Sequence, residues 1–507
     1  MVAHAFTVAF DGLRARPVEV QCALSAGLPS FSIVGLPDKA VSEARERVRA
    51  ALSALAVALP SRRITVNLSP AGLPKEGAHF DLPVALSLLA ALEILPPEEV
   101  ENCIAMGELS LDGTLNPVPG ALPAALTAAE EHRTLVCPAA CGPEAAWVGA
   151  AQVLAPADLR ALIGHFNGRS PLPPAKPGEM AADSPGPDFR DVKGQERARR
   201  ALEIAAAGGH HLLMIGPPGV GKSMLAARLP GILPPLDAAE ALETAVIHSR
   251  AGLLEAGGIT RRPPFRAPHH TASSAAIAGG GRGAKPGEMS LAHNGVLFLD
   301  ELPEFARPVL EALRQPVETG SVLISRAEAH VRYPCRFMLL AAANPCRCGH
   351  LSEPERACPR APNCGADYLG RISGPLMDRF DLCIEVPPVS FADLDQPAGG
   401  EPSADIARRV RAARAFQRER FRDTPGARLN RDAEAALLER IARPDAAGRA
   451  LLQRVAESFR LSARACHRIM RVARSIADLE GAAQVGRDHV AEAASFRLPT
   501  MPPGRPG

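Results

Sequence analysis

The chain has 507 residues, 47% of them hydrophobic and 22% charged, and its mean hydropathy is close to zero (+0.01). This size predicts two to four domains with hydrophobic cores, and the net charge of only +2 excludes a chain that binds polyanions over its whole surface. The longest apolar stretch, residues 82–95, is too short to cross a bilayer, and residues 1–12 lack the pattern of an export signal. With eleven cysteines as well, we expect a cytoplasmic protein.

The first part of the chain mixes strand-like and helix-like segments. Residues 31–34 and 64–68 predict strands, whereas apolar residues at helical spacing predict helices over 39–55 and 82–95. We therefore expect an α/β domain over residues 1–166. Residues 167–188 contain six prolines and predict a linker to the next domain.

A glycine-rich turn follows the apolar run 212–215, which predicts a buried strand. The turn has the spacing of a P-loop and consists of Gly216, Pro217, Pro218, Gly219, Val220, Gly221, Lys222 and Ser223. Glycines let the backbone aim successive N–H groups at phosphate oxygens, and the helix that follows directs its positive end at the same anion. Lys222 can reach the β- and γ-phosphates and Ser223 can ligate Mg²⁺, so the segment predicts ATP and Mg²⁺ as cofactors.

Two further apolar runs end in polar residues that suit the same chemistry. Residues 296–299 lead to Asp300 and Glu301, and residues 336–343 lead to Asn344. Asp300 is predicted to hold Mg²⁺, and Glu301 to orient and deprotonate the attacking water. Asn344 is predicted to hold that water or read the γ-phosphate; its alternative role is to form a turn before Pro345.

The last part of the chain is helical and strongly basic. A loop rich in Pro, Gly and Asp over residues 387–402 separates the P-loop module, 189–386, from a helical region, 403–500. Residues 403–474 contain 18 arginines, no lysine and only 8 acidic residues. Such a region can bind nucleic acid, or it can be a set of solvated arginine-rich helices.

Together these motifs resemble the AAA+ ATPases, and longer stretches resemble one family in particular. The stretches similar to the ComM/YifB family of bacterial magnesium-chelatase-like AAA+ proteins are 191–195, 265–271, 294–301, 344–346 and 372–381. The resemblance implies an AAA+ core with helix-two and pre-sensor hairpin inserts, and residues 403–500 as its C-terminal helical lid. It also implies a hexameric, ATP-driven DNA helicase that promotes branch migration of recombination intermediates in natural transformation, without a membrane partner.

The resemblance also suggests roles for two arginines. Arg379, in the segment 378–381, matches the arginine finger that reaches the ATP of the neighbouring subunit, and Arg371 is the competing candidate. Arg464 matches the second sensor, which contacts ATP from the lid. For Arg379 and Arg464 the alternative is a structural ion pair.

Both inserts contain residues that could contact DNA. Residues 321–333 read as two short strands around 326–329, and in related helicase modules this hairpin enters the ring pore, where Arg326 and His330 would contact phosphates. The segment 262–285 matches the helix-two insert, whose His269 and His270 either meet DNA or pack the insert.

Four cysteines lie within 19 residues of one another. Cys346, Cys348, Cys358 and Cys364 do not follow the common zinc-ribbon spacing, but four thiolates can enclose one tetrahedral Zn²⁺. We keep two readings, a structural zinc site and free thiols.

The N-terminal domain resembles a protease without its nucleophile. Residues 74–82 and 107–113 resemble the Lon-type protease fold, an α+β domain of the ribosomal S5 type. That protease needs a serine activated by a lysine, and the matching places here are His79 and Leu122, so we expect an inert domain. Two other functions stay open for the whole chain: the motor subunit of a metal chelatase, and a scaffold that binds ATP and rarely hydrolyses it.

Overall fold

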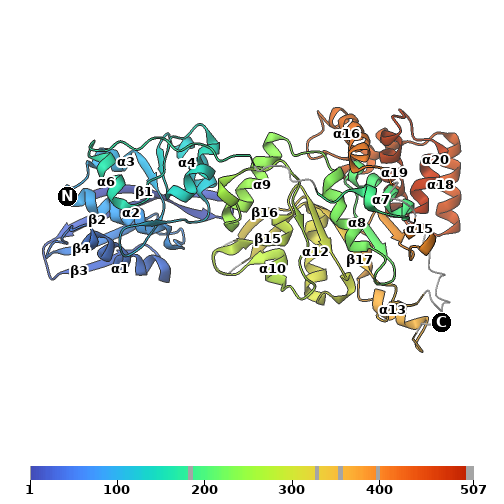
Figure 1. Ribbon diagram of the computed structural model, residues 1–507, viewed down its shortest axis with the longest axis horizontal. Helices are drawn as coiled ribbons and strands as arrows, with labels where there is room; N and C mark the ends of the chain where they lie inside the picture. Colours follow the sequence, from blue (N-terminus) through green and yellow to red (C-terminus); the bar gives the residue numbers. More distant parts are fainter. Residues whose placement is uncertain (1, 181–185, 326–329, 352–357, 396–399, 498–507) are drawn as a thin grey trace.

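The computed structural model describes residues 2–180, 186–325, 330–351, 358–395 and 400–497. Three parts follow one another along its long axis: an N-terminal α/β sheet domain, a central parallel-sheet domain and a C-terminal helical domain (Figure 1). None of the described helices combines the length and the apolar character that crossing a membrane requires.

The N-terminal domain is built on a seven-stranded mixed sheet with strand order β3-β4-β2-β1-β5-β8-β9. Its strands are β1 (Val2–Asp11), β2 (Arg14–Ser25), β3 (Ser30–Val34), β4 (Arg63–Ser69), β5 (Cys103–Ala105), β8 (Thr134–Val136) and β9 (Val153–Leu154). The expected strands and helices correspond to β3, β4, α1 (Lys39–Ala54) and α2 (Asp81–Ala91), which ends four residues before the expected 95. The longest strands, β1 and β2, form an antiparallel hairpin that the sequence analysis did not predict.

The central domain is a five-stranded parallel sheet with the order β11-β14-β17-β10-β18. The strands are β10 (Leu212–Ile215), β11 (Phe265–Arg266), β14 (Val296–Leu299), β17 (Met338–Ala343) and β18 (Leu382–Glu385). Side chains of β14 and β17 are buried throughout, as expected for a sheet covered on both faces. Because all strands are parallel, the residues that follow β10, β14 and β17 meet at one edge of the sheet.

Helices and two inserts surround this sheet. The principal helices are α7 (Glu196–Gly208), α8 (Lys222–Arg228), α9 (Ala238–Ala251), α12 (Arg307–Thr319) and α13 (Asn363–Leu369). The first insert carries α10 (Ser274–Ala278) and the two-stranded β12 (Gly279–Gly280) and β13 (Lys285–Pro286); the second is the hairpin of β15 (Ser321–Ser325) and β16 (His330–Pro334).

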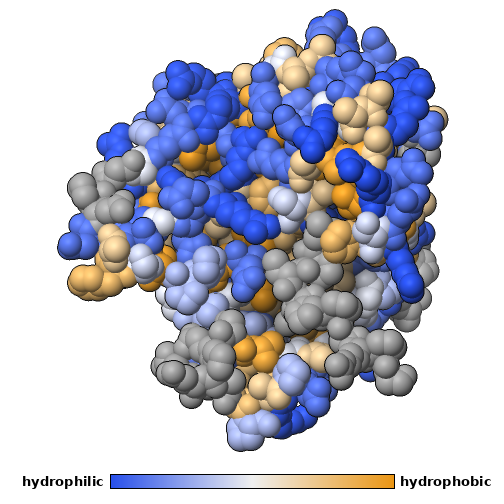
Figure 2. Space-filling view, turned by 90° about the vertical axis from the view of Figure 1, so that its right-hand side faces the viewer, coloured by the Kyte–Doolittle hydropathy of each residue, from blue (hydrophilic) through white to orange (hydrophobic). Residues whose placement is uncertain are grey.

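The helical domain packs directly on the sheet. It consists of α16 (Ser403–Arg420), α17 (Ala435–Ala442), α18 (Ala446–Ser458), α19 (Ala463–Leu479) and α20 (Arg487–Ser495). Leu202 of α7 and Ile469 and Val472 of α19 belong to one hydrophobic core, so this domain and one face of the sheet are packed together. The loop expected over 387–402 contains a short helix, α15 (Phe391–Asp395). The end of the molecule that carries α18 and α20 has a mainly hydrophilic surface (Figure 2).

Hydrogen bonds join the N-terminal domain to the end of α9 and the segment after it. The Gly120 N–H donates to the carbonyl of Ser249 at 3.1 Å, and the Arg250 guanidinium donates to the carbonyl of Gly12 at 3.2 Å. The Trp147 indole donates to the carbonyl of Gly257 at 2.8 Å. The first domain therefore holds the base of the first insert.

Candidate nucleotide-binding site

The glycines of the turn after β10 are needed for two different reasons. Gly219 (φ 82°) and Gly221 (φ 90°) adopt left-handed conformations that disfavour other residues, and Gly221 precedes α8 directly. Gly216 lies so close to the next strand that a Cβ would come within 2.3 Å of the Val386 carbonyl oxygen. The turn therefore presents its backbone N–H groups and the start of α8 to one point at the sheet edge.

Lys222 lies at the centre of this turn. Its ammonium group donates to the carbonyls of Gly216 at 2.6 Å and Pro217 at 2.8 Å, and to Oδ1 of Asn344 at 3.1 Å. Burial lowers the pKa of Lys222, and the charges of Asp300 and Glu301 oppose that shift. The lysine predicted to meet phosphates and the asparagine at the end of β17 are therefore in contact, although 122 positions separate them.

The residues predicted to hold Mg²⁺ also meet. The Ser223 hydroxyl donates to Oδ2 of Asp300 at 2.5 Å, so two hard oxygen atoms converge beside the turn, and they fit a Mg²⁺ ion that is completed by phosphate and water oxygens. Glu301 follows with a left-handed backbone (φ 51°), and its N–H donates to Oδ1 of Asp300 at 2.9 Å.

A contact that the sequence analysis missed involves Glu301. His270 Nδ1 lies 3.3 Å from Oε2 of Glu301, with side chains 32% and 48% exposed. His270 follows β11, the strand next to β14, which explains how it reaches the carboxylate. The His269 ring packs against it at a tilt, with ring centroids 4.2 Å apart, but His269 Nδ1 pairs with the Thr271 hydroxyl at 2.8 Å.

The two candidate arginine fingers occupy different surroundings. Arg371 lies 3.2 Å from Glu304, three residues after Glu301, so it lies near the nucleotide site of its own chain. Arg379 pairs at 2.5 Å with Glu318 near the end of α12 and has no contact with Lys222 or Asp300 among the described residues. Only Arg379 lies apart from the site of its own chain.

The other predicted ATP and DNA contacts have no described side-chain contact with the nucleotide site. Arg464 is exposed in the first turn of α19, after the N-cap Ser462. Arg326 lies outside the described residues, and His330 is described only as the backbone partner of Ser325 in the hairpin.

Three of the four clustered cysteines converge after β17. The sulfur atoms of Cys346, Cys348 and Cys364 lie within 4.8 Å of one another, and those of Cys346 and Cys348 are 3.0 Å apart. Cys358 is not one of these three, although it lies near Cys348 and Cys364. Hydrogen bonds from Cys346 and other neighbours lower the pKa of Cys348 to about 6, and the thiolate is the form that binds metals. The set is compatible with a tetrahedral zinc site.

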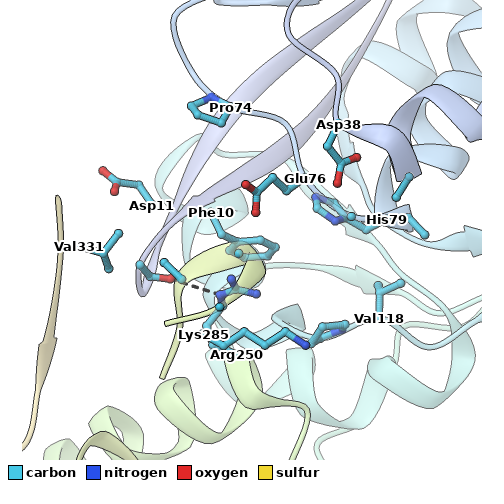
Figure 3. Close-up of a pocket in the computed structure, with 18 of the residues that line it drawn as sticks. Phe10, Asp11, Asp38, Pro74, Glu76, His79, Val118, Arg250, Lys285 and Val331 are labelled. Carbon is cyan, nitrogen blue, oxygen red and sulfur yellow. Dashed lines mark hydrogen bonds between the residues drawn. The ribbon is translucent and has the colours of Figure 1, made fainter. Parts of the chain in front are cut away.

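One of the two positions compared with the protease residues, His79, lines a pocket between the first two domains. The pocket has a volume of about 920 Å³, and Figure 3 shows His79 and Glu76 of the N-terminal domain opposite Arg250 and Lys285 of the central one. The buried His79 ring contacts the Val8 carbonyl at 2.9 Å, and burial lowers its pKa to about 4. Leu122 is buried in an apolar cluster. Neither side chain offers the serine–lysine chemistry, in line with an inert domain.

One edge of the parallel sheet brings together a P-loop lysine, a serine–carboxylate pair and a second carboxylate. This arrangement defines a P-loop ATPase. Three family models match the chain: "Subunit ChlI of Mg-chelatase" over 18–141, "Magnesium chelatase, subunit ChlI" over 188–394, and its C-terminal part over 400–497. The central domain is thus a magnesium-chelatase-type AAA+ ATPase domain.

Full-length relatives narrow the assignment. The chain is 43% identical to Competence protein ComM of Haemophilus influenzae, covering 98% of this chain and 97% of that protein. It is equally 43% identical to Uncharacterized protein YifB of Salmonella typhimurium, over 96% and 95%. A Magnesium-chelatase 38 kDa subunit of Rhodobacter capsulatus is 26% identical over 61% of this chain and 86% of that protein. The chain belongs to the ComM/YifB family of magnesium-chelatase ChlI-like proteins.

Proposed function

We propose that this protein is an ATP-driven DNA motor. The observation that carries the ATPase part is the convergence of Lys222, Ser223, Asp300 and Asn344 at one sheet edge, with Glu301 beside them. Lys222 and the turn bind the β- and γ-phosphates, and Ser223 and Asp300 hold Mg²⁺, which neutralises charge on those phosphates. Glu301 accepts the proton of the attacking water, and Asn344 orients that water.

The motor is proposed to be a hexameric ring. Arg379 lies apart from the nucleotide site of its own chain, which suits a finger that stabilises charge on the phosphoryl group bound by a neighbour. Arg371, which pairs with Glu304 next to that site, suits a structural role better. Arg464 completes the site from the lid, where its exposure leaves it able to reach a phosphate.

His270 is proposed to link DNA binding to hydrolysis. Its contact with Glu301 restrains the catalytic base, and the glycine-rich insert that follows can move the histidine when DNA binds. His269, Arg326 and His330 are the proposed DNA contacts of the two inserts.

The proposed biological role is branch migration of recombination intermediates during natural transformation, in the cytoplasm. It draws on the relative named a competence protein, on the arginine-rich lid and on the two inserts. In this proposal the inert Lon-like domain positions the inserts, and the four cysteines hold a structural zinc.

The test is the ATPase rate of purified protein with and without single-stranded and forked DNA at low salt, together with displacement of a labelled strand. A rate that ignores DNA would refute the motor. The similarity to a magnesium-chelatase subunit supports a second candidate function, the motor subunit of a metal chelatase. Its assay is Mg²⁺ insertion into a porphyrin with candidate partner subunits. A scaffold that binds ATP without turnover would show equal rates for wild type and Glu301→Gln.

A further inference from the structure

A second cleft lies between the central sheet and the lid, away from the P-loop. Its volume is about 730 Å³, and it is lined by the segment before α9, the starts of β14 and β17, and one face of α16. Strands β14 and β17 present their N-terminal ends here and their C-terminal ends to the nucleotide. The hairpin β15–β16 contributes no lining residue among those described.

The lining is strongly basic. It contains three carboxylates, Asp237, Glu240 and Asp432, and eight arginines: Arg261, Arg336, Arg411, Arg414, Arg418, Arg422, Arg428 and Arg431. The carboxylates are already engaged. Asp237 and Glu240 cap α9 reciprocally, and Asp432 accepts the backbone N–H groups of Arg428 and Leu429 at 2.9 and 3.0 Å.

Two of the arginines are held mainly by backbone carbonyls, although Arg431 Nε also lies 3.5 Å from Oδ1 of Asp432. The Arg414 Nε and Nη2 groups both donate to the Ala206 carbonyl, at 2.9 and 2.7 Å, and Arg431 donates to the carbonyls of Gly209 and Phe337. Burial and the charge of Arg431 lower the pKa of Arg414 to about 10. Carbonyls orient a guanidinium but do not neutralise it, so positive charge is concentrated inside the cleft.

Three more arginines face solvent at the same place. Arg336, Arg411 and Arg418 are exposed, and none of them forms an ion pair with a described residue. On α16, positions 411, 414 and 418 lie on one helix face and span roughly 10 Å at 1.5 Å per residue, and Arg422 follows the end of the helix. A row of this length matches successive phosphates of a chain better than it matches one compact anion.

We propose that this cleft binds the sugar–phosphate backbone of a single nucleic-acid strand, with Arg411, Arg414 and Arg418 as phosphate contacts. The proposal deepens the DNA-motor function and rests on it. It adds a contact on the lid side of the domain, distinct from the two inserts. The lining offers many guanidinium groups but no exposed aromatic ring, so we expect binding without base preference.

The test compares two double variants with the same change in charge. Arg411→Glu/Arg418→Glu alters the cleft, and Arg449→Glu/Arg454→Glu alters exposed residues of α18 in the same lid. Binding of a labelled 20-mer oligothymidine is followed by fluorescence anisotropy over a salt series, with a non-hydrolysable ATP analogue present. Circular dichroism and thermal melting establish that each variant is folded, and Arg411→Gln/Arg418→Gln is a milder substitute.

The cleft variant is expected to bind about tenfold more weakly at 0.1 M salt, while the α18 variant stays within about twofold of wild type. For the cleft variant, the slope of log binding constant against log salt concentration should decrease in magnitude by about 1.4, because two phosphate contacts are lost and each contributes about 0.7 on a single strand. Equal effects of the two variants would overturn the proposal. The proposal would also be overturned if sodium tripolyphosphate bound in the cleft but did not weaken the binding of DNA. If wild type itself binds no DNA, the proposed function fails; if wild type binds and the cleft variant is unaffected, only this inference fails.

Discussion

Removal of His270 tests whether this histidine restrains the catalytic base. In His270→Ala the 3.3 Å contact with Glu301 is lost, and the carboxylate is free to orient water. Both side chains are one-third to one-half exposed, so the contact contributes only about 0.2–1 kcal/mol. That energy corresponds to a shift of about 1.4- to 5-fold in the population of the unrestrained carboxylate.

The assay is steady-state ATP hydrolysis with and without saturating single-stranded DNA. Without DNA, His270→Ala should be faster than wild type by that 1.4- to 5-fold margin; with DNA, the two rates should converge. His269→Ala is the matched control, because this neighbour packs against His270 but pairs with Thr271. A basal rate equal to wild type would refute the restraint, and a loss of more than about tenfold would mean that His270 takes part in the chemistry itself.

Four further outcomes are expected. Glu301→Gln should retain ATP binding but lose about 10²- to 10⁴-fold in turnover, and a loss of binding instead would contradict its role as base. Arg379→Ala should lower turnover by about 10³-fold and Arg371→Ala much less, with activity regained when Arg379→Ala is mixed with Glu301→Gln subunits, since the finger acts between chains. Cys348→Ser should lower the zinc content measured by mass spectrometry, whereas Cys141→Ser should not; a wild type free of zinc would exclude the metal site. Burial by itself raises the pKa of Asp381, but the His210 ring, 3.4 Å away, and the charge of Arg471 hold that pKa well below its usual value. This carboxylate therefore stabilises the fold above about pH 4 and loses that contribution as pH falls. Asp381→Asn should therefore lower the melting temperature at pH 7 and flatten its decrease between pH 5 and 3.

Much of the nucleotide site could be predicted because local signals mark it. Buried strands have continuous apolar runs, and parallel strands end at one sheet edge, so the polar residues after 215, 299 and 343 were expected to meet. Helix ends were less accurate. The helix expected over 82–95 is α2, which already ends at Ala91, because Glu93 adopts a left-handed backbone (φ 58°) that a helix cannot continue.

The sequence by itself determined the P-loop chemistry, since glycines at positive φ and a Lys-Ser pair at the start of a helix act over a few neighbouring residues. Only the tertiary structure decided that His270 touches Glu301, that Arg379 pairs with Glu318, and that arginines of α16 share a cleft with the starts of β14 and β17. The physical reason is distance along the chain. Periodicity and turn chemistry report the local backbone, whereas these contacts depend on how the sheet, its inserts and the lid pack together.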